Sequence, residues 1–299
     1  MKKITIILFS LILCLALAAC GNKTTSNNDS NGQSEFTSEA TSNSGYFKLD
    51  VLDETVIEGY TDEGLKQTEL VIPADCTAIS GLRDNETVEQ IIFKNPDTVI
   101  EPSTFSGCTN LKHIKLPDNM KDIGRNMFNN CQSLKDVSLP DGVVSIAHDA
   151  FNNCTSLETI EFGNNLVAID RDAFWNCSSL KSLSLPDPVE TIGENAFKNC
   201  ESLEEVSFGT GLKTIGEEAF DACKNLKSVK LQEGVKSIEN YAFFTAGLEE
   251  IYLPASIESI SIQSIPQNIT VYVVEGSYAD QTLNGWVSDM GVRYNIQYQ

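Results

Sequence analysis

The sequence predicts a repeat solenoid of the α+β class, a stack of about eight coils of 23 residues with a cap at each end. Phenylalanine recurs every 23 residues, and cysteine follows it three residues later in every unit but the last. The repeated positions are Phe105, Phe128, Phe151, Phe174, Phe197, Phe220 and Phe243, with Cys108, Cys131, Cys154, Cys177, Cys200 and Cys223. Chance does not place seven aromatic residues in strict register, so the period indicates a repeating structural unit.

The repeating unit reads Ile-Gly-x-x-Ala-Phe-x-x-Cys-x-x-Leu-x-x-Val-x-Leu-Pro, and residues 192–209 follow it with Phe208 and Gly209 in place of the final Leu and Pro. The alternation of apolar and polar side chains in Leu-x-x-Val-x-Leu predicts a strand with one buried face. The Ala-Phe-x-x-Cys segment, often preceded by an acidic residue or Asn, predicts one short helical turn per coil. No unit can bury its Phe, Cys and Leu alone, so stacking must place them in continuous internal ladders.

This unit resembles the BspA-like class of leucine-rich repeats, a family of bacterial and protist surface proteins with 23-residue units. The resemblance covers roughly residues 46–299. It implies an N-terminal cap at 46–67, a leucine-rich-repeat solenoid at 68–262 and a C-terminal cap at 263–299. Unlike ordinary leucine-rich repeats, the chain has no regular Asn in the turn after the strand, so the curvature of a standard horseshoe is not implied. Adhesion is the role that the resemblance implies.

Residues 1–19 are predicted to be a lipoprotein signal peptide. Two lysines precede an apolar run at residues 4–16, which is too short to span a bilayer comfortably. The run Leu-Ala-Ala-Cys-Gly at 17–21 resembles the lipobox of bacterial lipoproteins, which implies cleavage before Cys20 and lipidation of its thiol. The alternative is an ordinary signal peptide. We expect the mature protein on the extracellular face of a bacterial envelope, held to the membrane by its lipid alone.

The segment at residues 20–45 is predicted to be a disordered linker. From 21 to 45, fifteen of the residues are Ser, Thr or Asn, which have almost nothing to bury. Loss of the signal peptide removes two lysines, which leaves 19 basic against 42 acidic residues and a net charge of −23. A surface this acidic repels nucleic acid and anionic lipid headgroups. We therefore expect no nucleic-acid partner.

The repeated cysteines are predicted to form a buried ladder of thiols. Equivalent side chains in stacked strands lie about 4.8 Å apart, whereas a disulfide needs Cβ atoms near about 3.8 Å. The row is also a line, unlike the tetrahedron that zinc needs. Buried cysteine behaves as a small hydrophobic residue. We therefore expect neither a metal nor a cofactor, with disulfides or a metal site as the alternatives.

The sequence also predicts a protein that is not an enzyme. Its two histidines, His113 and His148, lie outside metal-ligand spacings, and no nucleophile elbow or phosphate-binding glycine loop is present. The alternative weighed was a β-helix enzyme that acts on polysaccharide, which would need paired carboxylates in one groove. Instead, the first exposed strand position alternates in charge from Lys135 onward, which predicts cross-strand ion pairs between neighbouring coils.

The candidate ligand-binding residues lie at two sets of exposed positions. Glu161, Glu205, Lys230 and Tyr252 are on the outward face of the predicted strands, where residues vary between coils while the core is fixed. Trp175 and Phe244 occupy the position directly after the repeat Phe; they are either interface anchors or side chains packed on a neighbouring coil. We expect the strand face to bind a partner across several coils, on a shallow surface without a cavity of several hundred cubic ångströms.

The leading hypothesis is a monomeric display module that binds an extracellular protein or glycan. The alternative is a lipoprotein that organises other envelope proteins as a scaffold.

Overall fold

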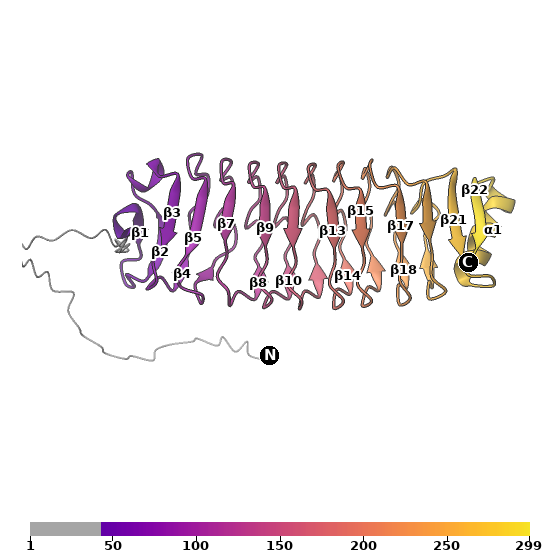
Figure 1. The fold of residues 1–299 in the computed structure, drawn as a ribbon, viewed down its shortest axis with the longest axis horizontal. Coiled ribbons are helices and arrows are strands. Elements are labelled where there is room, and N and C mark those ends of the chain that lie inside the picture. Colours follow the sequence, from indigo (N-terminus) through magenta and orange to yellow (C-terminus); the bar gives the residue numbers. More distant parts are fainter. Residues whose placement is uncertain (1–42) are drawn as a thin grey trace, which may run out of the picture. The chain divides into compact units, whose positions relative to one another are not determined.

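The computed structural model describes residues 43–299, so the predicted signal peptide, Cys20 and most of the predicted linker lie outside the described residues. This part of the chain is a parallel β-solenoid (Figure 1), in which successive coils of about 23 residues stack in chain order. The stack of 23-residue coils is therefore confirmed.

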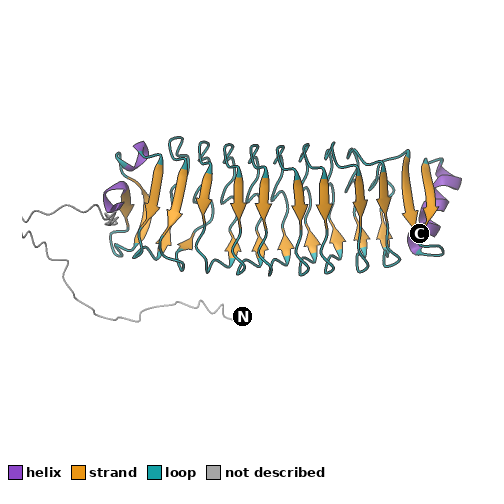
Figure 2. Cartoon of the chain, viewed as in Figure 1, coloured by secondary structure: helices purple, strands orange, loops and turns teal. Residues whose placement is uncertain are grey.

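Each coil contributes two strands, which form two rows along the solenoid (Figure 2). The row of longer strands contains β3 (Glu69–Ile72), β5 (Gln90–Phe93), β7 (His113–Lys115), β9 (Asp136–Ser138), β11 (Thr159–Glu161), β13 (Ser182–Ser184), β15 (Glu205–Ser207), β17 (Ser228–Lys230), β19 (Glu250–Tyr252), β21 (Ile269–Val273) and β22 (Tyr294–Tyr298). The row of shorter strands contains β2 (Val56–Tyr60), β4 (Ala78–Ile79), β6 (Val99–Ile100), β8 (Asp122–Ile123), β10 (Ser145–Ile146), β12 (Ala168–Ile169), β14 (Thr191–Ile192), β16 (Thr214–Ile215), β18 (Ser237–Ile238) and β20 (Ser259–Ile260).

The solenoid has about eleven turns, more than the eight that the repeat count predicted. The difference arises at the two ends. Strands β3 and β5 belong to coils that lack the repeat Phe, yet they pair in the same parallel register as the regular coils. At the other end, β21 pairs with β19 and β22 pairs with β21, so two more strands continue the row of longer strands beyond the last repeat.

The predicted helical turn at Ala-Phe-x-x-Cys is wrong. The segment is a pair of tight turns, because one residue before and one after the Ala-Phe step adopt left-handed backbone conformations. In the third regular coil these are Asp149, with φ of 59°, and Asn153, also with φ of 59°. Asn and Asp tolerate this conformation better than other residues that carry a Cβ atom. A left-handed residue every fourth position prevents a helix from propagating.

The core consists of side-chain ladders that run along the solenoid. All seven repeat phenylalanines are fully buried, and neighbouring rings stack with centroids 5.0–5.6 Å apart. The seven described cysteines are buried and carry free thiols. Each repeat thiol donates a hydrogen bond to a backbone carbonyl of the preceding coil, as Cys154 does to the carbonyl of Phe128 at 3.2 Å. The thiol therefore both fills space and satisfies a buried backbone acceptor.

The ends of the solenoid differ from its middle. At the N-terminal end, η1 (Asn43–Tyr46) leads into β1 (Phe47–Leu49), which pairs with β2 in antiparallel orientation, and η2 (Gly64–Lys66) follows. At the C-terminal end, α1 (Tyr278–Met290) connects β21 to β22 and buries Ala279 and Leu283. Ser277 caps this helix, and its hydroxyl accepts a hydrogen bond from the amide of Asp280 at 3.2 Å. In the range 43–299 no helix is long and apolar enough to cross a membrane.

Candidate functional site

The outward face of the longer strands places four of the predicted binding residues on one surface. Along each strand the middle residue points into the core and its neighbours point outward, as in β11, where Ile160 is buried and Glu161 is exposed. Glu161, Glu205 and Lys230 are exposed on β11, β15 and β17, and Tyr252 is half-buried on β19. The prediction that they bind a ligand is not tested by their positions, but they do share a face.

Several side chains on this face already contact one another. Glu161 accepts a hydrogen bond from the hydroxyl of Ser138 at 2.9 Å. The ring of Tyr252 stacks on that of Tyr272, with centroids 4.2 Å apart and planes 5° from parallel. In contrast, the side chains of Glu205 and Lys230 make no hydrogen bond or ion pair within residues 43–299. Of the four residues, these two are free to meet a ligand without breaking an existing contact.

Trp175 and Phe244 do not belong to this face. They lie in the tight turns between a shorter strand and the next longer strand, three coils apart. Trp175 is half-buried. Phe244 is 45% exposed, and its ring packs edge-to-face with that of Tyr241, with centroids 5.1 Å apart. The two intervening coils carry Lys198 and Asp221 at this position, joined by an ion pair of 3.4 Å. The two aromatic rings therefore form no common patch.

The predicted charge alternation produces ion pairs along part of the strand face. Lys181 pairs with Glu158 at 2.5 Å, and Lys227 pairs with Glu249 at 3.6 Å. The hydrogen bond and the charge of Lys181 hold the pKa of Glu158 below its usual value. These groups are largely exposed, so water screens each pair and the pair adds little to the stability of the fold. Within the described residues, no ion pair joins Lys135 to Glu158, Lys181 to Glu204 or Glu204 to Lys227, although the alternation predicts all three.

The last of these three, between Glu204 and Lys227, would join the coils of β15 and β17, where the row of longer strands is interrupted. On the N-terminal side of β15, the amide of Glu204 donates to the carbonyl of Lys181 at 2.9 Å, and the amide of Leu185 donates to the carbonyl of Ser207 at 2.9 Å. In the part of the chain that the structure describes, neither bond has a counterpart between the coils of β15 and β17. A second interruption lies between β11 and β13, but there Lys181 still donates to the carbonyl of Glu158 at 3.3 Å.

Both interruptions follow the coils in which Phe-Gly replaces the consensus Leu-Pro. The ring of Phe208 packs edge-on against Phe220, with centroids 5.9 Å apart and planes at 84°. A Cβ atom on Gly209 would lie 2.3 Å from the carbonyl oxygen of Pro186, so only glycine allows this approach. Thr210 then donates from its amide and its hydroxyl to the carboxylate of Asp187, at 2.9 and 3.0 Å. Gly209 and Thr210 thus hold the chain after β15 against the preceding coil, whereas Phe208 packs against the coil of β17.

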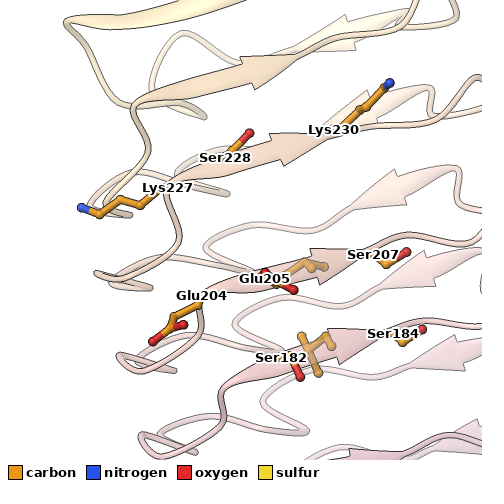
Figure 3. Close-up of a pocket in the computed structure, with 10 residues that line it drawn as sticks. Ser182, Ser184, Glu204, Glu205, Ser207, Lys227, Ser228 and Lys230 are labelled. Atoms are coloured by element: carbon orange, nitrogen blue, oxygen red, sulfur yellow. The ribbon is translucent and has the colours of Figure 1, made fainter.

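The interruption opens a hollow of about 590 Å³ on the strand face, lined by residues of β13, β15 and β17 (Figure 3). Val206 forms part of its floor and is half-buried, whereas the equivalent Leu183 and Val229 are only 3% and 1% exposed. The hollow contradicts the prediction of a strand face without such a cavity. Glu205 and Lys230 line it; Glu161 and Tyr252 do not.

Most side chains that line the hollow are polar, and its acidic and basic side chains belong to different coils. Glu204 and Glu205 lie on or beside the middle strand, β15; Lys227 and Lys230 lie on or beside β17; and Ser182 and Ser184 lie on β13, on the other side of β15 (Figure 3). The hydroxyl of Ser228 donates to Glu250 at 2.9 Å. Within residues 43–299, no group of three or more His, Cys, Asp or Glu side chains could hold a metal ion.

Comparisons with known proteins agree with the repeat. Residues 82–204 and 146–271 match the family described as BspA type leucine rich repeat region, in six copies. A leucine-rich repeat protein of T. pallidum is 28% identical over 72% of this chain and 83% of its own, with a TM-score of 0.46. A leucine rich cell surface protein of Faecalibacterium prausnitzii A2-165 is 20% identical over 79% of this chain and 94% of its own, with a TM-score of 0.39.

The pneumococcal vaccine antigen PcpA is 18% identical over 81% of this chain and 83% of its own, with a TM-score of 0.39. No curated protein matches the chain. The repeat match covers residues 82–271, which is more than half of the sequence. The chain therefore belongs to the family of BspA type leucine-rich repeat proteins.

Proposed function

We propose that the chain is a non-catalytic cell-surface lipoprotein whose solenoid binds an extracellular protein or glycan through the outward face of its longer strands. The observation that carries the proposal is the contrast between the core, which repeats from coil to coil, and this face, whose residues vary along the solenoid. A rigid sheet with varied exposed side chains suits recognition of a macromolecule over several coils. The family is generally non-catalytic, which agrees with a binding role.

The proposed location rests on the sequence before residue 43. Lipidation of Cys20 would tether the solenoid to the membrane through the Ser/Thr/Asn-rich segment, on the extracellular face of the envelope. Replacement of Cys20 with Ala should release the protein into the medium or leave the precursor uncleaved. Labelling with a radioactive fatty acid measures this directly. Full membrane retention of the variant without any lipid label in the unchanged protein would contradict the proposed anchor.

The proposed partner is a macromolecule rather than a small molecule or a nucleic acid. The net charge of −23 after removal of the signal peptide disfavours an anionic polymer. We propose that the protein acts as a monomer without a cofactor, and that its membrane contact is through the lipid.

A capture experiment with the purified full-length chain tests the binding face. The chain and a variant with Glu161, Glu205, Lys230 and Tyr252 all replaced by Ala are incubated with host extract and with envelope extract. We expect the variant to lose capture while its melting temperature falls by only a few degrees, because three of these side chains are exposed and the main loss is the Tyr252–Tyr272 stack. The control variant replaces Trp175 and Phe244 with Ala.

The outcomes separate the hypotheses. Capture that survives in the strand-face variant but is lost in the control variant places the site on the turns and contradicts the proposal. Strand-face-dependent capture from envelope extract alone would favour the scaffolding role over adhesion.

A further inference from the structure

Three charged side chains of the hollow, on the neighbouring coils of β15 and β17, have no charged partner within residues 43–299. They are Glu204, Glu205 and Lys230. Lys227 reaches only Glu249, at 3.6 Å and with both side chains more than half exposed. Some charges elsewhere on this face are paired across neighbouring coils, as between Lys112 and Glu89 at 2.9 Å and between Lys181 and Glu158 at 2.5 Å. The hollow thus combines acidic side chains at its middle strand, β15, with basic side chains at β17.

Backbone groups at this place also lack strand partners. The amides of Lys227 and Phe208 donate to no acceptor in the described part of the chain. The adjacent coils differ, because the corresponding amides of Glu204 and Leu185 are bonded across β13 and β15. A polypeptide ligand supplies backbone carbonyls that can accept hydrogen bonds from such amides.

We propose that this hollow binds an extended segment of a partner protein that carries basic side chains along one edge and acidic side chains along the other. The inference rests on the proposed binding function and assigns it a site and a ligand class. In an extended segment, successive side chains point to opposite sides. A segment of alternating basic and acidic residues therefore directs its positive side chains at Glu204 and Glu205 and its negative side chains at Lys227 and Lys230.

Other ligand classes fit the hollow less well. None of the residues that line it is aromatic, so a neutral sugar ring has no aromatic face to stack on. An anionic polysaccharide would be attracted by Lys227 and Lys230 but repelled by the neighbouring glutamates and by the acidic protein as a whole. A peptide of alternating charge can pair with the glutamates and with the lysines at once, and electrostatic complementarity of this kind determines specificity.

Two peptides of identical composition test the geometry. The first, Lys-Glu-Lys-Glu-Lys-Glu, presents one charge on each edge when extended, and the second, Lys-Lys-Lys-Glu-Glu-Glu, does not. Both are labelled with the same fluorophore, and anisotropy is measured against the full-length chain at low and at moderate salt. We expect the alternating peptide to bind about tenfold more tightly than the block peptide. Equal affinities would overturn the proposal.

A pair of matched variants locates the site. Glu205→Lys reverses one of the two acidic charges of the hollow, whereas Glu161→Lys makes the same charge change on the same face outside the hollow. We expect Glu205→Lys to weaken binding of the alternating peptide about tenfold and Glu161→Lys to leave it unchanged. Similar losses in both variants would show that only the overall charge matters, and would overturn the assignment.

A second pair of variants tests the origin of the hollow. Phe208→Leu combined with Gly209→Pro restores the consensus, which should close the hollow and abolish peptide binding. The same change at Phe162 and Gly163 alters the other Phe-Gly coil and should leave binding intact. If the first variant fails to fold, Glu205→Lys still decides the question.

The failure of this proposal is distinguishable from that of the proposed function. If neither peptide binds but capture of a partner is still lost in the fourfold strand-face variant, the hollow does not bind a charged extended segment, whereas the binding face stands. If a neutral glycan binds and Glu205→Lys removes that binding, the ligand class is wrong.

Discussion

Two neighbouring strand contacts, β13–β15 and β15–β17, differ although they share β15 and the same core. The rings below them stack almost identically: Phe174 lies 5.1 Å from Phe197, and Phe197 lies 5.3 Å from Phe220. The shorter strands β14, β16 and β18 pair without interruption beneath both contacts. Yet β13 and β15 pair over three residues, whereas β15 and β17 do not pair. The aromatic ladder therefore fixes the stacking of coils, and the residues after each long strand decide whether that strand pairs.

The largest expected effect comes from the feature that both contacts share. Phe197→Ala removes a fully buried ring that stacks on both of its neighbours. The free energy of unfolding should fall by about 3–5 kcal/mol, with the loss concentrated in adjacent coils. Denaturant titration measures the loss. A change below about 1 kcal/mol would show that the ladder does not hold the coils together.

The pH dependence of stability should reflect the buried thiols. Burial raises the pKa of the Cys108 thiol to about 12, above the value of about 9 for an exposed thiol. Between these values the unfolded chain releases a proton that the folded chain keeps. The free energy of unfolding should therefore be unaffected by this thiol below pH 9, and above it should fall by about 1.4 kcal/mol per pH unit. Cys108→Ala should remove that share of the slope in denaturation curves recorded from pH 8 to 10.5; an unchanged slope would contradict it.

Substitution at the end of β15 should turn the unpaired contact between β15 and β17 into a paired one. Restoring Leu and Pro at positions 208 and 209 should allow the amide of Lys227 to bond to the coil of β15. Hydrogen exchange of this amide should slow by about tenfold, which corresponds to about 1.4 kcal/mol of local opening free energy. The amide of Glu204, already bonded to Lys181, is the internal control and should change little.

The smallest expected effect concerns the stacked tyrosines at the C-terminal end of the face. Tyr252→Ala removes the ring that stacks on Tyr272 and should cost about 0.5–1.5 kcal/mol. Lys230→Ala, on the neighbouring strand, removes an exposed side chain that makes no hydrogen bond or ion pair within residues 43–299. It should change the free energy of unfolding by less than about 0.5 kcal/mol. Thermal unfolding distinguishes the two; equal shifts would contradict the stacking seen at Tyr252.

The core of the fold could be predicted from the sequence because its period is long and strict. Phe105 to Phe243 give the coil length, and the cysteines three residues later give a second ladder in the same register. The shorter strands could not be predicted, because a pair such as Ser145–Ile146 is too short to show an alternation. The helical turn was predicted wrongly because Asp149 and Asn153 serve as left-handed turn residues, whereas a residue such as Asp149 before Ala-Phe also resembles a helix cap.

The candidate site was predictable only in part. The outward alternation places Glu161, Glu205, Lys230 and Tyr252 on one face, as the strand pattern predicts. The hollow was not predicted, although its signal is visible in the sequence as Phe208-Gly209 in place of Leu-Pro. What such a change does depends on how closely Gly209 approaches Pro186 in the preceding coil, and that distance is a property of the packed solenoid rather than of the local sequence.

Hydrogen exchange at the amide of Lys227, with and without a bound partner, tests the account most directly. In the free full-length protein this amide should exchange fast, because it has no acceptor in the described structure, while the equivalent amide of Glu204 is protected. Addition of the captured partner should protect Lys227. Protection confined to the turns around Trp175 and Phe244, with Lys227 unchanged, would contradict the assignment of binding to the strand face.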